Sequence, residues 1–301
     1  MPSLSVPCRL CGGPSAHVAT YDIRLLRGYW AKVDAAIPPV EIRRCRTYGS
    51  YFTSTVPTPA LIEAQYMVDW DDYYSDDRSP ERKADRCLAQ IARFVPFGSR
   101  IMDVGGGNGA FSLVAAARYD SWLQELHPGR SERIVEAGVT VLSRIEETPD
   151  GTFDAITLWD VYEHVWPHDR FLDPIRRALS PRGLLLIEVP SPSHLVPLQL
   201  LLGRLSHTPR REMCLSQVCD FSHLQLMTAR ELRHELGMRG FEVLHSESLS
   251  ELSYAGAVYA RRLIPSDRLA GWVGSAFDRR PLRRIVLGNN KTFVVARPRK
   301  R

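Results

Sequence analysis

One stretch, Arg100 to Phe111 (RIMDVGGGNGAF), constrains the fold more than any other part of the chain. Its first half is strand-like and carries one acid, Asp103, and its end is an apolar run typical of a helix. Four glycines join the two halves: Gly105, Gly106, Gly107 and Gly109. Glycine is needed where the backbone takes a positive φ or approaches a ligand closely. The stretch therefore predicts a strand that passes through a tight turn into a helix, whose first N–H groups favour a polar or anionic group.

Composition indicates a globular protein. The chain has 301 residues, of which 44% are hydrophobic and 24% charged, enough for one large domain with additions or for two domains. The longest apolar candidate, 195–205, contains a proline, a glycine and an arginine, so we expect no transmembrane segment. The six cysteines follow no repeating frame and we find no secretory signal, which favours a cytoplasmic protein. The net charge of +5 is only mildly basic.

Residues 1–60 look like a small separate module. Cys8 and Cys11 form a C-x-x-C knuckle, and the segment at Cys45 repeats it with Tyr48 where a second cysteine would stand. Two complete knuckles would be a strong zinc signal, and three cysteines are a weaker one. The fourth ligand is His17, a residue elsewhere in the chain, or absent. If it is absent, the module is a zinc-ribbon-like fold that has lost its metal and packs around Tyr48.

The rest of the chain alternates between strands and helices. Residues 61–98 contain a linker with an aromatic and acidic stretch at 66–77, which either covers a ligand or packs on the next domain, and then a helix from Ser79. Over 99–301 we expect strands at 101–104, 121–126, 139–142, 153–159, 184–189, 241–245 and 291–296, and helices at 110–119, 131–137, within 161–179, and at 229–238. Thr228-Ala-Arg-Glu231 has the spacing of a capping box at the start of the last helix. This alternation predicts an α/β fold with a parallel, doubly wound sheet.

Two stretches interrupt the alternation, at 190–220 and 249–290. Insertions of this length after strand ends are typical of lids or binding loops. Contact with a second copy in a homodimer, or surface packing, is the alternative.

Several residues follow strand ends at the edge where open α/β sheets bind nucleotide-like ligands. Glu125 ends the second strand and is placed to bind ribose hydroxyls. Arg144 and Ile145 follow the third strand and can flank an adenine ring. Trp159 and Asp160 end the fourth strand over the same site.

These motifs in order resemble the class I S-adenosylmethionine-dependent methyltransferases. The matching pieces are DVGGGNG at 103–109, Glu125, FDAITLWDVYEHV at 153–165, LSPRGLLLIEVP at 179–190 and HLQLMTARELRHELGMRGFEV at 223–243. The resemblance implies a Rossmann-like seven-stranded sheet with S-adenosylmethionine as cofactor. Residues 1–60 resemble the zinc-ribbon-like segment that precedes the catalytic domain in some bacterial sugar, glycan and natural-product methyltransferases, with zinc on Cys8, Cys11 and Cys45.

The resemblance also implies roles for the cofactor-site residues. Asp103 and the glycine turn at Gly105, Gly107 and Gly109 would hold the methionine part of the cofactor, and Glu125 the ribose. Arg144, Ile145 and Trp159 would line the adenine, with Asp160 beside them.

Asp160, Glu163 and His164 are spaced to share one face of a helix that begins at residue 160, and His223 is expected near the same edge of the sheet. With His223 they have the composition of a divalent-metal site, similar to the acid-x-x-E-H motif of ubiquinone-biosynthesis O-methyltransferases and small-RNA 2′-O-methyltransferases. Without metal, His164 or His223 can act as general base. In the third interpretation, Glu163 and His164 only brace the helix.

Three functions remain open from the sequence. The first is methyl transfer to a hydroxyl of a sugar, glycan or natural-product acceptor. The second is an RNA methyltransferase, disfavoured because the aromatic-basic surface expected for nucleic acid is thin. The third is a non-catalytic binding protein with the cofactor fold, which the complete glycine motif argues against.

Overall fold

The structure is a computed structural model of the chain. It describes residues 6–26, 37–58, 61–62, 79–126, 131–251, 260, 266–277, 279, 284–285 and 288–299. The aromatic and acidic stretch at 66–77 lies outside the described residues, as does much of the insertion at 249–290.

A seven-stranded sheet forms the centre of the larger part of the molecule, in the order β10-β11-β8-β7-β4-β5-β6. The strands are β4 (Arg100–Val104), β5 (Asp120–Gln124), β6 (Thr140–Leu142), β7 (Phe153–Trp159), β8 (Leu179–Pro190), β10 (Phe241–Leu249) and β11 (Lys291–Pro298). Strands β4 to β8 pair in parallel, and β11 pairs antiparallel with both β8 and β10. The predicted doubly wound, Rossmann-like sheet of seven strands is confirmed, but β11 runs antiparallel where only parallel strands were expected.

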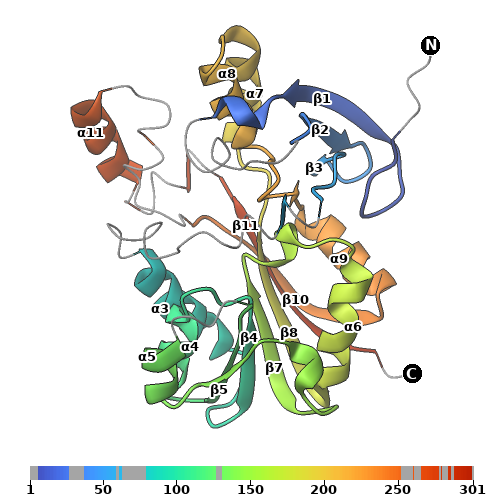
Figure 1. The fold of residues 1–301 in the computed structure, drawn as a ribbon, viewed down its shortest axis with the longest axis vertical. Coiled ribbons are helices and arrows are strands. Elements are labelled where there is room, and N and C mark those ends of the chain that lie inside the picture. Colours follow the sequence, from blue (N-terminus) through green and yellow to red (C-terminus); the bar gives the residue numbers. More distant parts are fainter. Residues whose placement is uncertain are drawn as a thin grey trace.

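Helices cover both faces of this sheet (Figure 1). On one face lie α3 (Ser79–Ile91), α4 (Ala110–Ala115) and α5 (Ser131–Glu136), and on the other α6 (His168–Ala178) and α9 (Ala229–Met238). The apolar strand β8 supplies both cores, because successive side chains of a strand point to opposite faces. Leu186 packs with α3 and α4, whereas Leu185 and Ile187 pack with α6 and α9.

Several element bounds differ from those expected. The helix after the glycine turn ends at Ala115 rather than at residue 119. The strand expected at 184–189 begins earlier, at Leu179, and the pairing within β8 shifts from Phe153–Leu179 to Ala155–Leu184. Strand β10 continues to Leu249 because β11 pairs with it along its whole length.

The N-terminal module supplies three strands of a second, four-stranded sheet. Its order is β1 (Ser15–Tyr21), β2 (Val40–Cys45), β3 (Tyr51–Thr53) and β9 (Gln225–Leu226), and the 3₁₀ turn η1 (Ile23–Leu25) follows β1. Strand β9 comes from the segment just before α9, so a distant part of the chain completes this sheet. Tyr51 pairs with Leu226 and Phe52 with Gln225.

The segment 190–220 packs against the N-terminal module (Figure 1). It forms α7 (Leu195–Leu205) and α8 (Arg210–Ser216), and Val196, Leu215 and Phe221 share a buried cluster with Tyr21 and other residues of the module. In the second insertion the structure describes α11 (Asp267–Phe277). Among the described helices, none is long and apolar enough to cross a bilayer.

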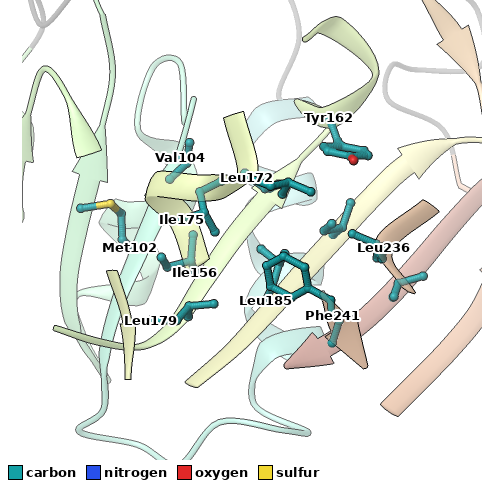
Figure 2. Packing of buried hydrophobic residues seen from close by; sticks show 14 of the residues in the cluster. Met102, Val104, Ile156, Tyr162, Leu172, Ile175, Leu179, Leu185, Leu236 and Phe241 are labelled. Carbon is teal, nitrogen blue, oxygen red and sulfur yellow. The ribbon is translucent and has the colours of Figure 1, made fainter. Parts of the chain in front are cut away.

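Figure 2 shows part of the core between the sheet and the helices α6 and α9. Phe241, at the start of β10, is fully buried in this cluster together with Leu185 and Leu236. Met238, three residues earlier, is 76% exposed.

We expect Phe241→Ala to lower the free energy of unfolding by about 3–5 kcal/mol, because it removes a buried ring and leaves a cavity. Met238→Ala is the matched control and is expected to change it by less than about 0.5 kcal/mol. Guanidinium denaturation measures both, and equal effects would contradict the position of Phe241 in the core.

Candidate functional site

The glycine turn packs tightly on β4, β5 and α5. A Cβ atom added at Gly106 would lie 2.5 Å from Asp103 Oδ2, and one added at Gly109 would lie 2.5 Å from Ile134 Cδ1. Gly109 also has a φ of 72°, which side-chain-bearing residues rarely adopt. These contacts explain why the turn needs glycine and fix it over the carboxyl end of β4.

Asp103 lies buried under this turn. Its Oδ1 accepts a hydrogen bond from Thr157 Oγ1 on β7 at 2.9 Å. Burial raises the pKa of Asp103 to about 7, although the hydrogen bond from Thr157 and the charge of Lys83 oppose the shift. A nearby positive charge would favour the ionised form.

Glu125 follows β5 and lies beside the same turn. Its carboxylate accepts hydrogen bonds from Gly107 N at 2.9 Å and from Leu126 N at 2.8 Å. The predicted ribose acid and the glycine turn therefore lie within one hydrogen bond of each other.

The three predicted adenine-site residues lie in different surroundings. Arg144 precedes the 3₁₀ turn η3 (Ile145–Glu147), and its side chain is 67% exposed. Ile145 is buried in the core cluster of β4, β7 and α6. Trp159 stacks on Phe293 and meets Phe111 edge-on, so its ring packs under α4. Their contact with adenine stays a prediction.

Asp160 does not begin a helix, and that expectation was wrong. Asp160 has a φ of 59°, the 3₁₀ turn η4 (Tyr162–His164) follows it, and α6 begins only at His168. Pro167 accounts for the delay, because a proline disfavours helical conformation in the residue before it. Asp160 is therefore not on one helix face with Glu163 and His164.

Asp160 instead joins a buried network of charges that sequence reasoning missed. Its Oδ1 accepts a hydrogen bond from Lys291 on β11, and its Oδ2 lies 2.9 Å from Lys83 Nζ on α3. Burial opposes ionisation of Asp160, but the charges of Lys291 and Lys83 outweigh it and hold its pKa well below the usual range. Beside it, Arg86 makes a bidentate pair with the fully buried Glu188 on β8.

The signal for this network was available in the sequence. Glu188 and Lys291 are charged residues in otherwise apolar strands, LLLIEV and KTFVVA. Lysine and glutamate are seldom fully buried unless they are paired. A charged partner for each of them could therefore be expected, although the sequence does not say which residue it is.

Glu163, His164 and His223 come together as predicted from the sequence. His164 Nε2 lies 3.7 Å from Glu163 Oε1, and the rings of His164 and His223 are 4.7 Å apart between centroids. The three side chains offer ligand atoms that all lie within 4.8 Å of one another. Glu163 is fully buried, and both of its carboxyl oxygens are without a hydrogen-bond partner among the described residues.

Two backbone contacts hold this cluster. His164 Nδ1 contacts the carbonyl oxygen of Ser222, and Leu224 N donates to the carbonyl of Glu163 at 3.1 Å. Burial lowers the pKa of His164, and burial together with the charge of Asp160 raises that of Glu163 well above its usual value.

A buried polar network connects η4 to α6, α9 and β9. Glu235 on α9 accepts hydrogen bonds from Tyr162 and, at 2.9 Å, from His168 Nδ1. Gln225 of β9 contacts the other ring nitrogen of His168 at 2.8 Å. The catalytic candidates are thus fixed by residues from α9 and β9 as well as by their own segment.

Three cysteines of the N-terminal module, Cys8, Cys11 and Cys45, also lie close together. The fourth potential ligand beside them is Glu231 of α9. His17 is exposed and contacts Thr20, so it is not part of this group.

Comparison with known proteins shows the family. A family model described as "Methyltransferase domain" matches residues 77–246. The chain belongs to the class I S-adenosylmethionine-dependent methyltransferases. The glycine turn, Asp103 and Glu125 all lie within the matched part, and S-adenosylmethionine is the cofactor of this family.

The chain is 28% identical over 110 residues to a protein of Mycolicibacterium smegmatis named as a probable S-adenosylmethionine-dependent methyltransferase. That match covers 35% of this chain and 37% of the relative. The chain thus spans little more than a third of the relative's length.

Solved structures are similar in fold. The 1,6-didemethyltoxoflavin-N1-methyltransferase of Burkholderia thailandensis has a TM-score of 0.50 at 14% identity, covering 89% of this chain and 98% of its own. A chain in the complex between the Haloferax volcanii Trm112 methyltransferase activator and a methyltransferase has a TM-score of 0.53 at 14% identity, covering 80% and 96%.

We expect the affinity for S-adenosylmethionine to rise about tenfold between pH 6 and pH 8. With a pKa of about 7, the ionised fraction of Asp103 grows about tenfold over this range, and the ionised form attracts the positive charges of the cofactor. Calorimetric titration at each pH measures the change.

Asp103→Asn is the matched variant, because an amide still accepts the hydrogen bond from Thr157. It is expected to bind more weakly at pH 8 and to lose most of the pH dependence. An unchanged slope in this variant would show that another group titrates.

Proposed function

We propose that this chain transfers the methyl group of S-adenosylmethionine to a hydroxyl oxygen of a small-molecule acceptor, a sugar, glycan or natural product, with His164 as general base. The observation that carries the proposal is the contact between His164 Nδ1 and the Ser222 carbonyl. A carbonyl oxygen only accepts hydrogen bonds, so Nδ1 carries the proton and Nε2 keeps a free lone pair.

The environment of His164 suits a base. Because burial lowers its pKa, the imidazole is neutral near pH 7. When bound, S-adenosylmethionine supplies an activated methyl group. His164 Nε2 takes the proton of the acceptor hydroxyl as the oxygen gains the methyl group, and S-adenosylhomocysteine is released.

Glu163 and His223 have separate roles beside this base: Glu163 stabilises its charged form, and His223 contacts the acceptor. The positive charge that forms on His164 is only 3.7 Å from the Glu163 carboxyl, which it draws towards the ionised form. The side chain of His223 is 48% exposed and its ring is tilted against that of His164, and we assign it to contact with the incoming acceptor. The segment at 190–220 lies close by, and we assign it to acceptor binding.

The reaction type is tested by incubating the protein and S-adenosylmethionine with nucleotide-activated sugars, free monosaccharides, phenols and matched amines. Mass spectrometry locates the methyl group in each product. Methylated oxygen on a hydroxyl acceptor supports the proposal. Transfer only to amines, or to none of the acceptors while cofactor binds, contradicts it.

On the best acceptor of that panel, we expect His164→Ala to lower kcat by about 10²- to 10⁴-fold, the usual contribution of a general base. Cofactor affinity should stay within about twofold, because His164 does not touch the glycine turn. His17→Ala, at an exposed histidine of the N-terminal module, is the control. Full activity of His164→Ala would contradict His164 as the general base, and full activity of His223→Ala as well would exclude both histidines.

A divalent metal held by Asp160, Glu163, His164 and His223 is the second candidate arrangement. The grouping of Glu163, His164 and His223 favours it. The fourth residue, Asp160, has both oxygens on lysines, and these two positive charges oppose a dication beside them.

We therefore expect no effect of added Mg²⁺ or Mn²⁺ on the rate. The enzyme is gel-filtered to remove weakly bound ions and assayed with and without millimolar Mg²⁺ or Mn²⁺. A severalfold stimulation that disappears in Glu163→Gln would favour the metal arrangement instead.

A further inference from the structure

Four potential metal ligands meet where the N-terminal module touches α9. Cys8 and Cys11 come from the first knuckle, Cys45 from the end of β2, and Glu231 from the first turn of α9. Their ligand atoms all lie within 4.8 Å of one another. The three cysteines are free thiols.

Glu231 departs from the role that its sequence position predicts. The spacing from Thr228 is that of a capping box, and Thr228 Oγ1 does accept from Glu231 N at 3.2 Å. In a capping box the glutamate side chain would turn back to the backbone of the cap residue. Here Glu231 Oε1 instead accepts from Cys8 Sγ at 3.4 Å, so the carboxylate turns towards the cysteines.

This carboxylate is otherwise poorly compensated. Glu231 is fully buried, and its Oε2 has no hydrogen-bond partner in the described part of the chain. Among the ion pairs of the described residues, none includes Glu231. A buried carboxyl group without a cation takes up a proton instead of staying charged, and a bound metal ion would stabilise its ionised form.

Two separations within the cluster are close to those around a tetrahedral zinc ion, and all of them are within 4.8 Å. With Zn–S bonds near 2.3 Å and Zn–O bonds near 2.1 Å, two sulfur ligands lie about 3.8 Å apart, and a sulfur and an oxygen about 3.6 Å apart. Cys11 Sγ and Cys45 Sγ are 3.7 Å apart, and Cys8 Sγ and Glu231 Oε1 are 3.4 Å apart. Three sulfurs and one oxygen are a donor set that suits zinc.

Tyr48, which stands where a fourth cysteine would be expected, has a different place. Its ring stacks on His234 of α9, and the guanidinium carbon of Arg230 lies over the ring, 5.3 Å from its centroid. Its backbone N–H donates to Cys45 Sγ at 3.4 Å, so Tyr48 lies beside the cysteine cluster without offering it a ligand atom from its ring.

We propose that Glu231 is the fourth ligand of a structural zinc ion held by Cys8, Cys11 and Cys45. The ion then bonds the N-terminal module directly to α9. Since α9 also carries Glu235, which supports η4, loss of zinc loosens the frame around His164. This inference is independent of the acceptor and of the reaction proposed above.

The first measurement is the metal content of the full chain purified without chelator. Elemental analysis is expected to give one zinc per chain. X-ray absorption at the zinc edge is expected to show three sulfur ligands and one oxygen ligand. Absence of bound metal in folded protein that also takes up no added zinc, one equivalent of another metal, or four sulfur ligands would each overturn the proposal.

Glu231→Gln tests the fourth ligand, because it keeps the size of the side chain and removes its charge. We expect zinc affinity to fall at least about tenfold, measured by competition with a chromogenic chelator. The visible spectrum of the cobalt-substituted protein should also shift, because it reports the ligands directly. Glu242→Gln, at an exposed glutamate of β10, is the control.

Cys45→Ser and Cys214→Ser complete the comparison. Cys214 is a buried cysteine of α8 outside the cluster, so its variant should keep one zinc while Cys45→Ser loses it. If Cys45→Ser does not fold, the zinc affinity and cobalt spectrum of Glu231→Gln still show whether Glu231 is a ligand. Equal zinc affinity and unchanged cobalt spectra in wild type and Glu231→Gln would exclude Glu231 as a ligand.

Discussion

The buried charges around Asp160 and Glu188 are the interaction on which the arrangement of this edge of the seven-stranded sheet depends. They join α3 through Lys83 and Arg86, β7 and β8 through the two acids, and β11 through Lys291. Removing one partner of such a buried pair leaves an uncompensated charge and costs about 3–5 kcal/mol, far more than an exposed pair. The network therefore specifies one arrangement of four elements that apolar packing alone would leave less defined.

The network also sets the electrostatics of the site. Lys83 and Lys291 keep Asp160 ionised, and Asp160 in turn raises the pKa of Glu163. On the other side of the same edge, Asp103 lies buried with a raised pKa below the glycine turn. Three carboxyl groups within a few residues of strand ends therefore differ in protonation, because burial raises the pKa of Asp103 and Glu163 whereas two lysines lower that of Asp160.

The sequence predicted the parts of the fold that depend on local patterns. The glycine turn after β4, the acid after β5 and the apolar strands β7 and β8 are each readable from adjacent residues, and their order specifies the sheet. Asp160 shows where prediction from local sequence patterns fails. Helical spacing suggested one face with Glu163 and His164, but a positive φ and Pro167 end that pattern locally. The partners Lys83, Glu188 and Lys291 are far apart in sequence, so only the closed sheet brings them together. Glu231 could not be assigned either, because its spacing fits a helix cap equally well.

The two-residue strand β9 has a consequence for how this chain can be divided. Because β9 completes the N-terminal sheet, and because Phe221 and Leu226 share the apolar cluster of that sheet, the module and the methyltransferase fold bury each other's surfaces. A cut near residue 60 would leave an open strand edge on one piece and an uncovered apolar face on the other. The module therefore cannot be exchanged for that of a relative as an independent cassette; a chimera would have to carry the 214–226 segment along with residues 1–60. If the module influences which acceptor is bound, a change of acceptor would then require matched substitutions in both 1–60 and 214–226.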